Sequence, residues 1–92
     1  MLIEFNLKVT ENFELKFAKI YPDFTKNLVS KVNHLSPSEI KMCMCLKMSY
    51  SNSQIKGYLK ISDSTLANLR SSVRHKIGLG RSQSLSNAIL CI

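Results

Sequence analysis

A row of hydrogen-bonding side chains recurs between residues 63 and 77 at the spacing of one helical face. At 100° per residue this row spans only about 60° of the helix, and its members are Ser64, Asn68, Ser71 and His75. The opposite side is apolar, with Leu66, Leu69, Val73 and Ile77. Small polar groups flanked by cations suit base edges and phosphates in a DNA major groove. An ordinary solvated helix face has the same pattern, so both interpretations stay open.

Other residues that could do chemistry lack the partners that catalysis needs. The six acids fall at expected helix starts or on solvated faces, without the pairing that acid/base catalysis requires. His34 is expected in a loop, and Ser36 and Ser62 are expected to cap helices. Cys43 and Cys45 lie two apart in an expected helix, so their side chains diverge by about 200° and cannot bind one metal ion. We expect no catalytic residue, no metal site and no cofactor.

The charge of the chain is high and uneven. Its 92 residues include 13 Lys and Arg against 6 Asp and Glu, a net charge of +7, and no acid follows Asp63. Such a field attracts nucleic acid or an anionic membrane surface, although it also fits a basic surface kept for solubility. No apolar run approaches the roughly 18 residues of a membrane span, and the amino terminus lacks the features of a secretory signal. We expect a cytoplasmic protein without a membrane segment.

The apolar periodicity predicts an all-α fold. Helices are expected over residues 11–21, 23–33, 37–48, 53–59, 63–77 and 82–91. Residues 2–9 alternate like a strand but also fit helical spacing, so they are either an extended arm or the start of the first helix. Ser36 to Glu39 form a capping box, and residues 40–48 are apolar nearly all round, which predicts a central covered helix. We expect the first 35 residues to help cover it.

The helices over 53–59 and 63–77 are separated by only a few residues. Two helices joined by a short turn, with a polar face on the second, are typical of a helix-turn-helix. Arg70 borders the apolar side of the second helix, and we expect it to anchor a carboxylate or carbonyl within the subunit.

Several of these segments also carry a resemblance to a known family. They are Leu35-Ser36-Pro37-Ser38-Glu39, Ser51-Asn52-Ser53-Gln54-Ile55, Leu59-Lys60-Ile61-Ser62, Thr65-Leu66 and Lys76-Ile77-Gly78-Leu79. Together they resemble the LuxR-type (FixJ/NarL-type) effector domain, and the preceding segment resembles the one before such domains in Bacteroidetes regulators. The resemblance implies a tetra-helical helix-turn-helix domain over 36–92 after an N-terminal arm and helical extension over 1–35. It also implies a transcriptional regulator whose recognition helix is 63–77.

The helical wheel and the resemblance together give the expected site. Base contacts are expected from Ser64, Ala67, Asn68 and Ser71. Phosphate contacts are expected from Lys56, Lys60, Thr65, Arg74, His75, Lys76 and Arg81. The last helix is expected to form a homodimer through Leu85, Ala88, Ile89 and Ile92. The partners would be double-stranded DNA, a second copy, and an upstream signalling domain or partner.

Two further functions compete with DNA binding. Ala67 and Leu69 stand where the family usually has lysine and histidine. The alternative is therefore a protein-interaction module that keeps the scaffold, has lost base readout, and exposes Leu85, Ile89 and Ile92 to a partner. The net charge would also suit RNA, but the sequence lacks the interleaved exposed aromatic residues that bind RNA bases, so we rank RNA binding last.

Overall fold

The structure is a computed structural model that describes residues 13–92. These residues form helices joined by turns, with no strand among them, so the all-α prediction is confirmed. After a helix over residues 13–20, the elements in chain order are α2 (Phe24–Lys31), α3 (Pro37–Lys47), α4 (Asn52–Leu59), α5 (Asp63–Ile77) and α6 (Leu85–Leu90). The expectations for residues 2–9 and 11–12 lie outside the described residues.

A serine stands immediately before each of the four helices from α3 to α6. Each serine hydroxyl accepts a hydrogen bond from the backbone N–H three residues further on, and the four are Ser36, Ser51, Ser62 and Ser84. The capping boxes of α3 and α4 are complete, because Glu39 and Gln54 accept from the backbone N–H of their own cap. Such caps satisfy backbone donors that have no partner inside the helix, which fixes where each helix begins.

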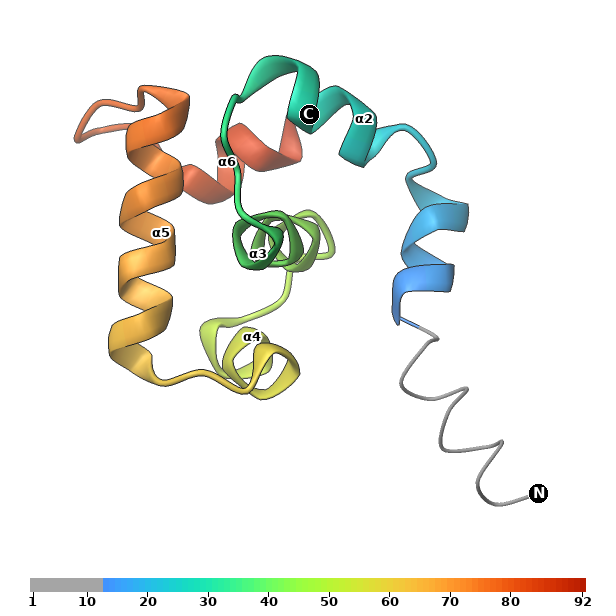
Figure 1. Cartoon of the computed structure of the whole chain (residues 1–92), viewed down its shortest axis with the longest axis horizontal. Coiled ribbons are helices and arrows are strands. Elements are labelled where there is room, and N and C mark those ends of the chain that lie inside the picture. Colours follow the sequence, from blue (N-terminus) through green and yellow to red (C-terminus); the bar gives the residue numbers. More distant parts are fainter. Residues whose placement is uncertain (1–12) are drawn as a thin grey trace.

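The helix α3 lies at the centre of the molecule. Figure 1 views it along its axis, with α5, α4, α6 and the N-terminal helices around it. It contacts α2, α4, α5 and α6, and the side chains that it buries include Met42, Cys43, Cys45 and Leu46. The prediction of a covered central helix is confirmed, and the apolar residues all round the helix axis are the physical reason.

The N-terminal helices share this core. Phe17, Phe24 and Leu28 are at most 3% exposed and belong to the same apolar cluster as α3. At the carboxyl end of α3, the Lys47 ammonium donates to the carbonyl of Leu90 in α6 and lies 4.9 Å from the centroid of the Tyr21 ring. Residues 13–35 are therefore part of the fold, as their apolar content predicted.

The last helix begins later than predicted. Residues 80–83 form a turn, in which the N–H of Gly80 donates to the side-chain carbonyl of Gln83. The cap at Ser84 then starts α6 at Leu85, three residues after the predicted start. The sequence before Ser84 contains other serines that could cap a helix, which is why periodicity alone misplaced this boundary.

Candidate nucleic-acid interface

The helix α5 stands at one edge of the molecule, opposite the helix over 13–20 (Figure 1). Its inward side chains Leu66 and Val73 are 3% and 0% exposed, and Leu69 and Ile77 are half-buried. Its predicted polar row is exposed in full, together with Ala67; the row is Ser64, Asn68, Ser71 and His75. The predicted orientation of α5 is thus confirmed, because burial of the apolar stripe turns the polar row to solvent.

A tight left-handed connection joins α4 to α5. Lys60 has φ 57° and ψ 51°, and the backbone N–H of Ile61 donates to the carbonyl of Lys56 at 3.1 Å. Ser62 then caps α5, accepting from the Thr65 N–H at 3.2 Å and donating to the Thr65 hydroxyl at 3.0 Å. This short path leaves the Lys60 side chain exposed beside the first turn of α5.

Both acids of the region 37–92 are paired with lysines. Asp63, at the start of α5, forms an ion pair with Lys56 of α4. Glu39, at the start of α3, lies 2.7 Å from the Lys76 ammonium, which also donates to the carbonyl of His34 at 2.7 Å. Within the described residues, these pairs leave six Lys and Arg of this region without an acidic partner; they are Lys41, Lys47, Lys60, Arg70, Arg74 and Arg81.

Glu39 is a buried carboxylate, only 3% exposed. Burial on its own raises the pKa of Glu39, but hydrogen bonds from Lys76, the Ser36 N–H and Ser72, together with the Lys76 charge, lower it to about 2. The carboxylate therefore stays ionised and holds Lys76 against the start of α3. The ammonium of Lys76, a predicted phosphate contact, is used inside the subunit.

Arg74 is also used inside the subunit. Its guanidinium donates to the carbonyl of Gln83 and to the carbonyl of Gly80, each at 2.8 Å. These bonds hold the turn between α5 and α6. Carbonyl acceptors carry no net charge, so the positive charge of Arg74 still contributes to the field on this side of α5.

A groove of about 390 Å³ runs along the flank of α5 that faces the amino terminus of α4. Its lining residues are Asn52, Asp63, Leu66, Ala67, Arg70, Ser71 and Arg74. The side chain of Arg70 forms no hydrogen bond or ion pair with any described residue, so the internal anchor expected for it is wrong. Its guanidinium instead lines the groove beside the positive end of the α4 dipole.

Sequence reasoning missed Arg70 and Asn52 as parts of this site. The wheel placed Arg70 at the border of the apolar stripe, and that position could have been read as a groove wall. No sequence signal placed Asn52 beside α5, because the crossing of α4 and α5 depends on tertiary contacts.

The expected dimer face of α6 is corrected by the structure. Leu85 and Ile89 are 1% and 0% exposed and belong to the core, because α6 turns this side toward α3. Ala88 and Ile92 are half-buried, while Leu90, on another side of α6, is 44% exposed. The apolar patch on which the protein-interaction alternative rested is therefore mostly inside the subunit.

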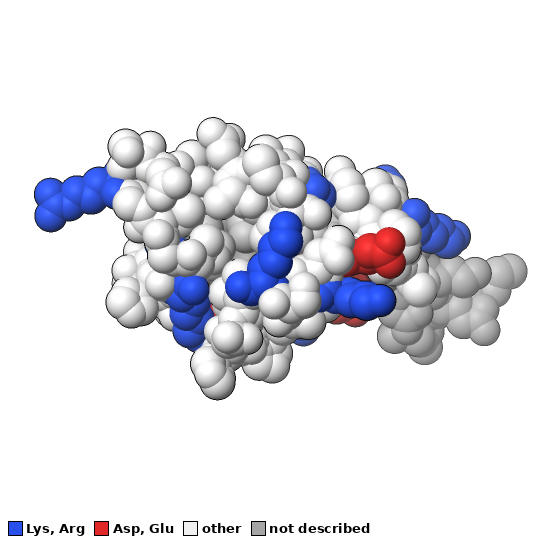
Figure 2. Space-filling model, turned by 90° about the horizontal axis from the view of Figure 1, so that it is seen from above, with Lys and Arg blue, Asp and Glu red and all other residues white. Residues whose placement is uncertain are grey.

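The remaining basic residue of the expected site, Arg81, is exposed in the turn before α6. Seen from above, Lys and Arg side chains are spread along the visible face, while Asp and Glu occupy a small area toward the N-terminal helices (Figure 2). No group of acids, histidines and cysteines in residues 13–92 could hold a metal ion. No helix in the described part of the chain has the length and apolarity to span a bilayer.

No protein-family model, curated protein or solved structure matches this chain.

Proposed function

We propose that this protein binds duplex DNA by inserting α5 into the major groove, with α4 and α5 acting as a helix-turn-helix in a transcriptional regulator. The observation that carries the proposal is the exposed, acid-free row on α5 beside a groove that holds two arginines. Polar side chains of this size reach base edges, and flanking cations hold phosphates.

Exposed residues of α5 contact the bases. Asn68 is the main base reader, because its amide can bond an adenine edge bidentately. Ser64, Ala67 and Ser71 line the same surface and contact neighbouring base edges, Ala67 through its methyl group.

The phosphates on either side of the DNA major groove are held by polar and basic groups around α5. Lys60, Thr65, His75 and Arg81 supply side chains, and the α5 flank adds Arg70 with the amino terminus of α4. Lys56, Arg74 and Lys76 act mainly by positioning, since each is bonded within the subunit.

A homodimer through α6 would have to use a side of this helix other than that of Leu85 and Ile89. Leu90 and Cys91 are exposed at the carboxyl end of α6, and Ala88 is half-buried. A dimer would let two copies of α5 contact two half-sites one helical turn apart.

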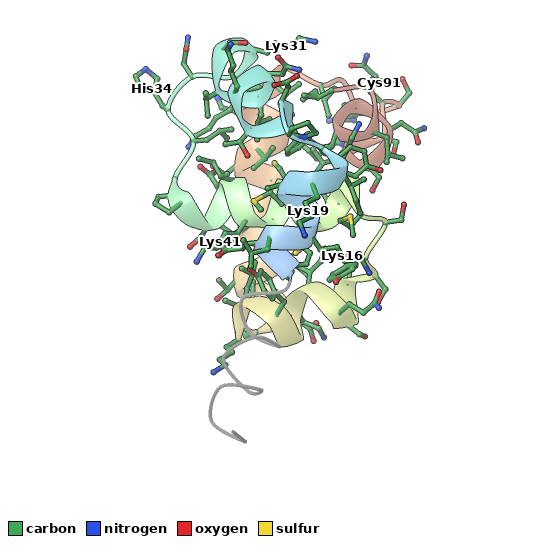
Figure 3. All side chains as sticks on the ribbon, turned by 90° about the vertical axis from the view of Figure 1, so that its right-hand side faces the viewer. Lys16, Lys19, Lys31, His34, Lys41 and Cys91 are labelled. Atoms are coloured by element: carbon green, nitrogen blue, oxygen red, sulfur yellow. The ribbon has the colours of Figure 1, made fainter. Side chains whose placement is uncertain are left out.

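The salt dependence of duplex binding tests the proposal. We expect Lys60→Ala and Arg70→Ala each to lower the slope of log affinity against log salt by roughly one unit. Lys19→Ala is the matched control, because Lys19 lies on the helix facing the viewer in Figure 3, whereas α5 lies behind. Fluorescence anisotropy at several salt concentrations measures all three. Equal slopes for the three variants and the parent would remove α5 and its flank from the footprint.

A further inference from the structure

A second groove lies on the side of the molecule that faces away from α5. It has a volume of about 470 Å³, and its lining residues are Phe13, Leu15, Lys16, Lys19 and Tyr50. Figure 3 looks onto this side, with Lys16 and Lys19 on the helix over 13–20 in front of the ribbon. The proposed DNA interface uses none of these residues, so the second groove needs its own explanation.

The wall of this second groove is apolar and aromatic. The rings of Phe13 and Tyr50 lie 5.4 Å apart between centroids, and both residues are half-buried. Leu15 is 56% exposed, which is the largest exposed fraction of any large apolar side chain in residues 13–92. An exposed leucine beside two accessible rings offers a place for a large apolar side chain of a partner.

The charged residues of the second groove are all basic. Lys16 and Lys19 are exposed, and neither forms an ion pair with any residue between 13 and 92. Burial, and next the negative charge of Glu14, raise the pKa of Tyr58. Glu14 is not among the residues that line the groove, and no acid lines it.

We propose that this second groove binds a segment of a partner protein in which a large apolar side chain is flanked by carboxylates. The apolar side chain fills the space between Leu15 and the two rings, and the carboxylates pair with Lys16 and Lys19. A second copy of the chain offers few carboxylates to Lys16 and Lys19, since it has 6 Asp and Glu against 13 Lys and Arg. Duplex DNA supplies phosphates, but its bases are stacked inside the double helix and cannot enter the space between Leu15 and the rings. The proposal does not depend on DNA binding.

The test titrates the ¹⁵N-labelled full chain with two hexapeptides, acetylated and amidated, and follows the amide resonances. The sequence Asp-Glu-Phe-Leu-Glu-Asp is the probe, and Asp-Glu-Ala-Ala-Glu-Asp is its control. We expect saturable shifts at Phe13 to Lys19 and Tyr50 with the probe, and at least about tenfold weaker binding of the control peptide. Equal binding of both peptides, shifts centred elsewhere, or no shift at millimolar probe would overturn the proposal.

Two double variants with equal changes in net charge separate local pairing from overall attraction. We expect Lys16→Glu with Lys19→Glu to weaken probe binding about tenfold or more, and Lys31→Glu with Lys41→Glu to change it less than about twofold. Figure 3 shows Lys31 and Lys41 away from the first pair. Thermal unfolding confirms that both variants fold. The proposal is wrong if both weaken binding equally, or if a short DNA duplex displaces the probe.

Discussion

The surface of α5 and the surface of the N-terminal helices are both basic, yet they differ in apolar exposure. Among residues 13–92, three of the four exposed large apolar residues lie in the N-terminal helices, and they are Leu15, Ile20 and Val29. The outward side of α5 has none and presents small hydrogen-bonding groups. Both proposals use basic side chains, but the α5 side suits a hydrated polyanion, whereas the N-terminal side suits an acidic partner with an apolar anchor.

The two surfaces rest on one core. Leu66 and Val73 hold α5 against α3, while Phe17 and Leu28 belong to the same buried cluster from the N-terminal side. The ring of Phe13 also lies 4.5 Å from the ring of Tyr58 in α4, between centroids, so the N-terminal helix contacts the helix that precedes α5. Both surfaces are therefore attached to the same core, and they differ in their outward residues.

The largest expected effect tests this shared attachment. Phe17 is 2% exposed, so Phe17→Ala removes a buried ring and leaves a cavity, and we expect a loss of about 3–5 kcal/mol in the free energy of unfolding. Leu15→Ala, on the same helix, should cost less than about 0.5 kcal/mol because Leu15 is exposed. Urea unfolding followed by circular dichroism measures both. Similar small losses would mean that the N-terminal helix is not part of the core.

The second effect concerns the ion pair that ties α5 to the start of α3. The folded pKa of Glu39 is about 2, below the ordinary value of 4.5, so its stabilising contribution is present above about pH 4.5 and is lost as the pH falls toward 2. The difference corresponds to roughly 3 kcal/mol. Urea unfolding at pH values from 6 to 2 measures it.

Glu39→Gln supplies the control for this pH dependence. The amide keeps most of the shape but cannot ionise, so the variant should be less stable at pH 6 and should lose correspondingly less stability between pH 4.5 and 2. An unchanged pH profile would assign the acid sensitivity to other carboxylates.

Local sequence signals predicted much of the architecture. The capping box at Ser36, the cap at Ser62 and Gly78 gave the start of α3 and both ends of α5, because caps act within a few residues of the helix terminus. The periodic stripe from Leu66 to Ile77 gave the orientation of α5. The apolar residues all round residues 40–48 gave the central helix.

These local signals did not predict which helices and side chains contact one another. Arg70 and Arg74 lie one helical turn apart on α5 and both line the first groove, yet only Arg74 also holds the α5–α6 turn. Leu85 and Ile89 form an apolar stripe that would serve a dimer or a core equally well. Which of these applies depends on where α6 lies against α3, and periodicity carries no information about that placement.

The third effect distinguishes α5 from other exposed helical surfaces. We expect Asn68→Ala to relax preference at one base position by about 1–3 kcal/mol while non-specific binding changes little, because one bidentate amide contact is lost. Asn87→Ala is the same change at an exposed asparagine of α6, and it should leave the preference intact. Selection of bound fragments from random duplex DNA measures the preference. Loss in both variants, or in neither, would contradict the role of Asn68.

The smallest expected effect compares two helix caps of the same chemistry. Ser62→Ala and Ser84→Ala each remove a hydroxyl that caps a helix, and each should lower the free energy of unfolding by about 1 kcal/mol. Only the first loosens the turn of α5 that carries Ser64, so Ser62→Ala should also weaken duplex binding at a temperature where both variants are folded. Urea unfolding and fluorescence anisotropy measure the two quantities. If both variants lost DNA affinity equally, the ordered start of α5 would have no special part in binding, and the contrast between α5 and the rest of the surface would fail.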